Sequence, residues 1–170
     1  MKMKISRVSR NGFTLIELLI VIALLGALAI GLLAAIDPFE QLKKGRDTSA
    51  RNTVSEFYNA NLRYYSVRGE FPWGTGGTSG YINTMTADII STLITAGELK
   101  NRFAELAGTS NLAKIYLNST SSDNLGVCFR PESKSFQIDP NTIYAADGVT
   151  SGGCISQVGA TGTPCYYCIL

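Results

Sequence analysis

The feature that most restricts the fold of this chain is an apolar run of 24 residues, Phe13 to Ile36, near its amino terminus. A helix rises about 1.5 Å per residue, so this run spans roughly 36 Å, enough to cross the roughly 30 Å hydrocarbon core of a bilayer. Its only ionisable side chain is Glu17. The run therefore predicts a membrane-spanning helix.

A short leader of residues 1–12 precedes this run. It carries four basic residues and no acid: Lys2, Lys4, Arg7 and Arg10. Basic residues beside a span favour the cytoplasmic side, so the chain from residue 37 onward is expected across the membrane. A cleavable secretory signal fits less well, because its apolar part has only about 7 to 15 residues and its small-residue cut site follows that part. A plain signal anchor, with Glu17 facing a neighbouring helix or the interface, is a second alternative.

Residues 11–23 read Asn-Gly-Phe-Thr-Leu-Ile-Glu-Leu-Leu-Ile-Val-Ile-Ala. This stretch resembles the cleavage and methylation motif of type IV prepilins and type II secretion pseudopilins. The resemblance is strong over about 25 residues and extends weakly to the turn at residues 69–72. In that family a membrane aspartyl peptidase cuts after the glycine and methylates the new amino terminus. The resemblance implies a cut between Gly12 and Phe13, with Phe13 as the N-methylated first residue.

The chemistry of the motif agrees with this interpretation. Gly12 has no side chain, so the backbone there can lie close to a protease. A carboxylate inside a span costs about 2.5 to 3.5 kcal/mol near the centre and less near an end, so Glu17 needs a partner. The methylated amine of Phe13 can still be protonated and can neutralise Glu17 of its own or the next subunit. In the family this pairing is thought to set the stagger of subunits during assembly.

The resemblance implies a structural subunit of a type IV pilus or pilus-like filament. It would be a single-pass precursor in the inner membrane and later part of an extracellular or periplasmic filament. The implied partners are a prepilin peptidase, copies of the chain or related pilins, and an inner-membrane assembly platform with its motor ATPase. A major pilin, a minor pilin in adhesion or DNA uptake, and a secretion pseudopilin all stay open. The rival from another class is an anchored domain that does not polymerise.

Composition argues against catalysis and against a nucleic-acid-binding fold. The chain has no histidine, which excludes Ser-His and Cys-His nucleophiles and imidazole metal ligands, so we expect no catalytic residues, no metal and no cofactor. The leader holds four of the 15 basic residues and none of the 13 acids, which leaves 11 basic and 13 acidic residues, a formal net charge of −2. Nucleic acid is therefore not expected as a partner, except for a DNA-uptake minor pilin.

Four segments follow from these patterns: a cytoplasmic leader at 1–12 that the peptidase removes, an assembly helix at 13–36, its amphipathic continuation at 37–67 and a globular head at 68–170. The 134 residues beyond Ile36 suit one domain of modest size. The second helix has its own start signal, because Asp37 can cap, Pro38 suits the first helical position and Glu40 completes a capping box. We therefore expect a kink or short break at residues 36–38.

The second helix carries an apolar stripe that should pack on a sheet. Its members are Ala50, Val54, Phe57, Asn61 and Tyr65, with Tyr58 and Leu62 beside them. Basic residues also follow this helix: Lys43, Lys44, Arg46, Arg51, Arg63 and Arg68. A solvated face explains them most simply; a filament interface or a DNA-contacting strip is the alternative.

The remaining pattern predicts an α+β, pilin-like fold, with the long amino-terminal helix packed on a small antiparallel sheet. We expect a loop at 68–80, helices at 86–96 and 101–107, and strands at 113–117, 126–130, 134–138 and 142–146. Residues 131–133 read as a hairpin turn between the middle strands. Thr84 or Thr86 should cap the first short helix, and Gly97 and Gly108 should end the two helices. The glycines at 74–80 lack the lysine of a phosphate-binding loop.

All four cysteines lie late in the chain: Cys128, Cys154, Cys165 and Cys168. On the translocated side, an even number predicts disulfides that staple a loop-rich carboxyl-terminal region. The sequence allows three pairings and selects none, although Cys128 in a predicted strand favours a bond to a later cysteine. A redox pair of Cys165 with Cys168 and a zinc site are weaker alternatives.

Two further patterns carry little weight. Asp123, Asp139 and Asp147 lie in turn-rich segments, where ordinary turn roles are favoured over calcium binding because their spacing is unlike an EF-hand. Residues 118–120, Asn-Ser-Thr, fit a glycosylation sequon, which is a common pattern.

Overall fold

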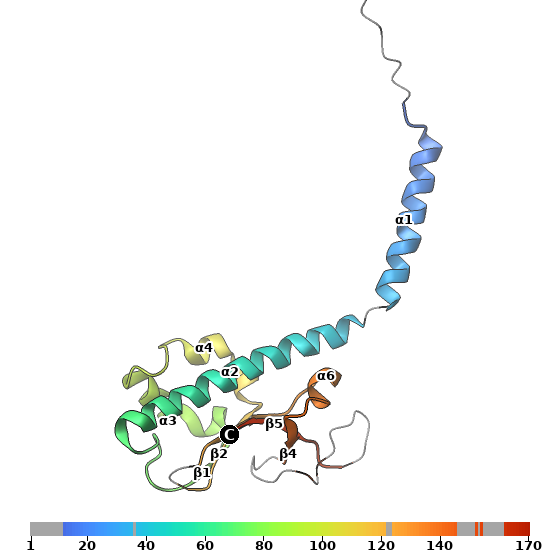
Figure 1. Cartoon of the computed structure of the whole chain (residues 1–170). Helices are drawn as coiled ribbons and strands as arrows, with labels where there is room; N and C mark the ends of the chain where they lie inside the picture. Colours follow the sequence, from blue (N-terminus) through green and yellow to red (C-terminus); the bar gives the residue numbers. More distant parts are fainter. Residues whose placement is uncertain (1–11, 36, 122–123, 146–151, 153, 155–161) are drawn as a thin grey trace, which may run out of the picture. The chain divides into compact units, whose positions relative to one another are not determined.

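The computed structural model describes residues 12–35, 37–121, 124–145, 152, 154 and 162–170 (Figure 1). The chain divides into two compact units, Met1–Pro38 and Phe39–Leu170, and each is described by itself. The first unit contains α1 (Leu15–Ala35). Within the described residues, α1 alone is long and apolar enough to cross a membrane, over Leu15–Leu33 with a mean hydropathy of 2.8. The predicted apolar helix is thus confirmed.

The second long helix, α2 (Pro38–Arg68), is a separate element, as the predicted break requires; Ile36 itself lies outside the described residues. Proline is well suited to a helix start, because the first amide of a helix has no acceptor within it. The helix ends at Gly69, whose φ of 75° is in the left-handed region and whose amide donates to the Tyr65 carbonyl at 2.7 Å. Glycine tolerates that backbone conformation without steric cost.

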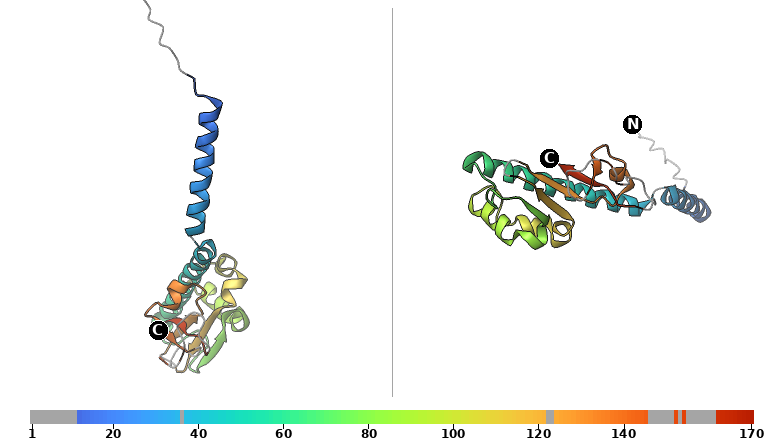
Figure 2. Two further views of the ribbon diagram at one scale, coloured as in Figure 1. Left: turned by 90° about the vertical axis from the view of Figure 1, so that its right-hand side faces the viewer. Right: turned by 90° about the horizontal axis from the view of Figure 1, so that it is seen from below.

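The second unit is built on a five-stranded antiparallel sheet with strand order β1-β2-β3-β5-β4 (Figures 1 and 2). The strands are β1 (Thr78–Tyr81), β2 (Ile115–Ser119), β3 (Gly126–Phe129), β4 (Thr142–Tyr144) and β5 (Tyr166–Ile169). β2 and β3 form a hairpin in which Ile115 pairs with Phe129. The expected sheet is confirmed, although β1 and β5 fall in segments that sequence patterns assign to loops.

α2 buries one side against this sheet. The buried apolar residues of α2 are Ala50, Val54, Phe57, Ala60 and Tyr64. Their partners in the core include Ile115, Leu117, Val127, Phe129 and Tyr167. The guanidinium of Arg51 lies 5.4 Å from the centre of the Tyr167 ring, so Tyr167 faces α2.

The predicted stripe of α2 is largely correct. Ala50, Val54, Phe57 and Asn61 are buried, and Tyr58 and Tyr65 are half-buried. Leu62 was wrongly assigned to the buried side, because its side chain is 38 % exposed while Ala60 and Tyr64 take up the core positions.

Three helices follow β1: α3 (Ile82–Thr95), α4 (Phe103–Ala107) and α5 (Thr109–Leu112). α3 begins earlier than predicted, because Ile82 is fully buried and carries the chain from β1 straight into the helix. The prediction that Thr84 caps α3 is wrong, since its hydroxyl donates to the Tyr81 carbonyl. The side chain of Thr86 lies outside the described residues. Gly97 and Gly108 follow α3 and α4 with φ of 81° and 78°, as predicted helix ends.

Residues 134–138 are wrongly predicted as a strand, and the hairpin at 131–133 is wrong with it. The structure has a helical turn there, α6 (Lys134–Gln137), capped by Ser133, whose hydroxyl accepts from the Phe136 amide at 3.4 Å. The alternation of polar and apolar residues imitates a strand. The helical turn forms in place of a strand because the carboxylate of Asp47, distant in the sequence, binds the amides just before it.

Asp47 of α2 is a buried carboxylate, only 2 % exposed. It accepts from the amide of Glu132 at 3.0 and 3.1 Å, from the amide of Ser133 at 2.7 Å and from the hydroxyl of Ser133 at 2.6 Å. Two turns earlier, Glu40 accepts from the amide of Lys134. A buried carboxylate is tolerated only where hydrogen bonds replace its lost hydration. α2 therefore holds the start of α6 through two of its acids.

We predict that Asp47→Asn lowers the free energy of unfolding of the second unit by about 2 to 4 kcal/mol, because the new amide would oppose three buried donors and leave some unsatisfied. Urea unfolding of the detergent-solubilised chain can be followed through Trp73, the single tryptophan. Asp88→Asn is the matched control at an exposed position and should change stability by less than about 0.5 kcal/mol. Equal effects of the two variants on stability would contradict the role of Asp47 in holding the start of α6.

Candidate amino-terminal processing and assembly site

The predicted processing residues lie just outside α1. Gly12, Phe13 and Thr14 have no helical structure, and the first helical residue is Leu15. Phe13 is 82 % exposed in the isolated chain. The bond between Gly12 and Phe13 is therefore open to an approaching enzyme, because no side chain or helical hydrogen bond of the described residues covers it.

A reciprocal set of hydrogen bonds starts α1. Glu17 accepts from the Thr14 amide at 2.9 Å and from the Thr14 hydroxyl at 2.7 Å, while the Glu17 amide donates to the Thr14 hydroxyl oxygen at 3.3 Å. This is a capping box, in which the residue at the cap and the acid three positions later satisfy each other's free groups. In the isolated subunit the Glu17 carboxylate thus has a partner in its own chain.

Beyond this first turn, α1 is apolar on every side. Its large side chains are between 45 % and 82 % exposed in the chain alone. A helix that is apolar all round is stable only in a membrane or among other helices. α1 therefore requires surroundings that the chain itself does not supply.

The structure brings Gly12, Phe13 and Glu17 together at one end of α1 and places the four cysteines in the second unit. Cys128 is bonded to Cys168 and Cys154 to Cys165. Cys128 therefore reaches a later cysteine, and the predicted disulfide-stapled carboxyl-terminal region is confirmed. Cys165 and Cys168 are not bonded to each other.

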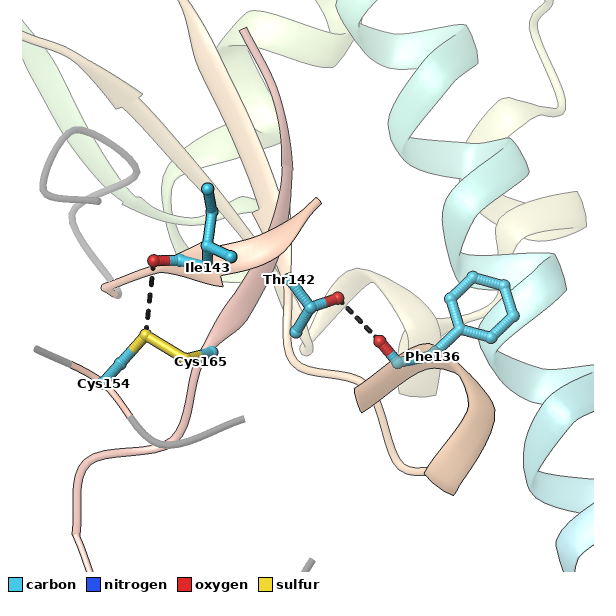
Figure 3. Close-up of a disulfide and its surroundings, with 5 residues drawn as sticks. All are labelled: Phe136, Thr142, Ile143, Cys154 and Cys165. Atoms are coloured by element: carbon cyan, nitrogen blue, oxygen red, sulfur yellow. Dashed lines mark hydrogen bonds between the residues drawn. A yellow bond between two sulfur atoms is a disulfide. The ribbon is translucent and has the colours of Figure 1, made fainter. Parts of the chain in front are cut away.

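The Cys154–Cys165 disulfide lies beside β4 (Figure 3). The Cys154 sulfur lies 3.3 Å from the carbonyl oxygen of Ile143 in β4, a contact and not a hydrogen bond, because a disulfide sulfur carries no proton. The hydroxyl of the neighbouring Thr142 donates to the Phe136 carbonyl at 2.7 Å. These contacts join β4 to the disulfide on one side and to α6 on the other (Figure 3).

The remaining candidates have structural places. Asp139 accepts from the Asn141 amide at 2.9 Å, which is a turn role; Asp123 and Asp147 lie outside the described residues. Within the part of the chain that the structure describes, no three acidic, cysteine or histidine side chains gather as metal ligands. Asn118 of the sequon is buried in β2, so the folded head does not present it for glycosylation.

Comparison with known proteins supports the interpretation of the amino terminus. Residues 7–33 match the prokaryotic N-terminal methylation motif, the signature of type IV pilins and pseudopilins. The motif supports a type IV pilin-like or pseudopilin precursor, and suggests a structural rather than an enzymatic protein. It implies processing by a prepilin peptidase and assembly into pilus-like filaments, and with α1 it fits a membrane-anchored precursor. No curated protein and no solved structure gives a significant match.

Sequence reasoning missed two roles that the structure reveals. The Thr-x-x-Glu spacing of Thr14 and Glu17 is a local capping-box signal and could have been recognised. The hydrogen bonds by which Asp47 holds the start of α6 leave no pattern in the neighbouring sequence, because its partner Ser133 lies 86 residues away.

We predict that the oxidised chain yields a peptide with Cys128 linked to one with Cys168, and a single peptide that contains Cys154 and Cys165 joined by an internal disulfide. Trypsin separates Cys128 from the later cysteines, and chymotrypsin cuts after Tyr166 or Tyr167, between Cys165 and Cys168. Mass spectrometry of the digest without reduction identifies the pairs. A peptide linking Cys128 to Cys154 would contradict this pairing.

Proposed function

We propose that this chain is a structural subunit of a type IV pilus or pilus-like filament, processed between Gly12 and Phe13 and assembled through α1. The single observation that carries the proposal is the match to the methylation motif over residues 7–33. Within this range Gly12 stands directly before the apolar run, which supports it as the site of cleavage. The leader is then residues 1–12, and the second unit is the head that crosses the membrane.

The geometry of the junction supports this proposal. The Gly12–Phe13 bond lies outside the helix, as a scissile bond should, because proteases bind extended backbone. A helix apolar on all sides suits both states of such a subunit, since α1 can sit first in a bilayer and then among identical helices.

The proposed role of Glu17 is to pair with the methylated amine of a neighbouring subunit. In the isolated chain its carboxylate is held by Thr14. An amine brought near by assembly offers a stronger, charged partner in a medium of low dielectric. The subunit register would then be set where Glu17 meets that amine.

The first experiment is mass spectrometry of the membrane-extracted chain. We expect a mature amino terminus at N-methyl-Phe13. A chain that still begins at Met1 would overturn the proposal and favour an anchored domain that does not polymerise, and a cut beyond residue 36 would identify a secreted domain.

We predict that Glu17→Gln abolishes filaments while leaving a folded, membrane-held subunit. Glutamine can keep the capping box with Thr14 but cannot neutralise an amine, so this variant separates helix capping from charge pairing. Glu17→Ala and Glu17→Leu remove both and should also yield no filaments. Sheared filaments are counted by electron microscopy and the subunit by immunoblot. Normal filaments from Glu17→Gln would refute the charge-pairing role.

Abundance separates the remaining alternatives within the filament class. A major pilin dominates sheared filaments, whereas a minor pilin or a pseudopilin is scarce there. We propose the pilus or pilus-like subunit first, and keep as its alternative a secretion pseudopilin or a minor pilin in adhesion or DNA uptake.

A further inference from the structure

The face of the sheet opposite α2 carries a group of tyrosines and cations. Tyr167 faces α2, and side chains alternate along a strand, so its neighbours Tyr166 and Cys168 point to the opposite face. By the same alternation and the strand register, Tyr81 and Tyr116 share that face. Lys114 and Arg130 lie just beyond the Ile115–Phe129 pair, at the end of the hairpin.

The tyrosines form one cluster. The rings of Tyr81 and Tyr116 meet edge to face with centroids 5.2 Å apart. Tyr166 is hydrogen-bonded to Tyr81; burial, then this bond, raises the pKa of Tyr166, and the positive charge of Arg130 opposes the rise. Tyr81 is 41 % exposed, so part of this aromatic cluster is open to solvent.

Two adjoining hollows meet at Lys114 and Arg130. The first, of about 210 Å³, is lined by Tyr81, Tyr166, Ala113 and these two cations. The second, of about 410 Å³, is lined by the same two cations together with Lys43, Pro131, Glu132 and Gln137. The first hollow adds tyrosines to these two cations and the second adds Lys43, so a ligand that reaches from one hollow to the other contacts Lys114 and Arg130.

Positive charge is in excess around the second hollow. Among the described residues that line it, Glu132 is the one acid; its Oε1 is bonded to Lys114, and its Oε2 lies 3.5 Å from Nη1 of Arg46. The hydrogen bond from Lys114 lowers the pKa of Glu132, so this acid stays ionised and holds Lys114 in place. Lys43 and Arg130 make no ion pair within the described residues. The hollow therefore suits an anion, although the chain after its leader is slightly acidic overall.

We propose that this surface binds single-stranded nucleic acid, with a phosphate in the second hollow and a base against the tyrosines. A nucleotide has a planar ring separated from its anionic group, which matches two hollows that share Lys114 and Arg130. A uronic sugar carries its carboxylate on the ring and needs no second hollow. Aromatic rings beside cations are the usual composition of sequence-tolerant single-strand sites. This inference goes beyond the proposed filament function and does not depend on processing or assembly.

The test uses the full chain in a nonionic detergent and a fluorescein-labelled oligothymidylate of about 20 nucleotides, longer than common site sizes. Anisotropy should show saturable binding that weakens as salt rises, because phosphate contacts release counterions. We expect Arg130→Gln and Lys43→Gln each to weaken binding about fivefold to tenfold. Lys100→Gln, an equal loss of charge at an exposed position outside both hollows, should leave affinity within about twofold.

Competition on the unaltered chain tests the first hollow without any substitution. Unlabelled oligothymidylate should displace the probe at least about tenfold better, per charge, than inorganic polyphosphate or polyglutamate, because only the oligonucleotide can stack. A duplex of the same sequence should compete less well. Tyr81→Leu should weaken binding of the oligonucleotide and not of polyphosphate; Trp73 fluorescence reports whether that variant is folded.

Three results would overturn the proposal. These are absence of saturable binding, an equal loss of affinity in Lys100→Gln and Arg130→Gln, and competition by polyphosphate as good as that by the oligonucleotide. Stronger competition by polyglutamate would assign the surface to an acidic protein partner and would also overturn it.

Discussion

The second unit depends on the carboxylate of Asp47. It connects the middle of the long helix to the segment that follows β3, and it replaces its lost hydration with donors from Glu132 and Ser133. Ser133 then caps α6, which in turn receives the hydroxyl of Thr142 in β4. One buried charge thus organises the connection between β3 and β4. It also positions Glu132, whose own carboxylate bonds Lys114 at the edge of the hairpin.

The parts that sequence could predict are those whose cause is local. α1 and α2 follow from long patterns, and Gly12, Phe13 and Glu17 are recognisable because the motif is continuous. β1 could not be predicted, since its four residues include Gly80 and gain their structure from pairing with β2. α6 was missed because two acids far away in the sequence hold its start: Asp47 accepts from the amides of Glu132 and Ser133 just before the helix, and Glu40 accepts from the amide of Lys134.

The same distinction separates the two surfaces of functional interest. The processing junction consists of neighbouring residues, 12–17. The tyrosine and cation surface consists of residues between positions 43 and 166, which come together only when the sheet folds. The net charge gives no sign of this surface, because a chain that is slightly acidic overall can still bring several cations together, here Lys43, Lys114 and Arg130. Composition therefore excludes a uniformly basic surface and does not exclude a local one.

The strand order has a consequence for the timing of folding. β5 lies between β3 and β4, and Cys128 in β3 is bonded to Cys168, which follows it by 40 residues in the sequence. If the second unit crosses the membrane from residue 39 onward, neither β3 nor β4 can pair with β5 until residues 166–169 have crossed. Until then one edge of β3 and one edge of β4 stay unpaired, and the sheet of the second unit is complete only when β5 enters between them.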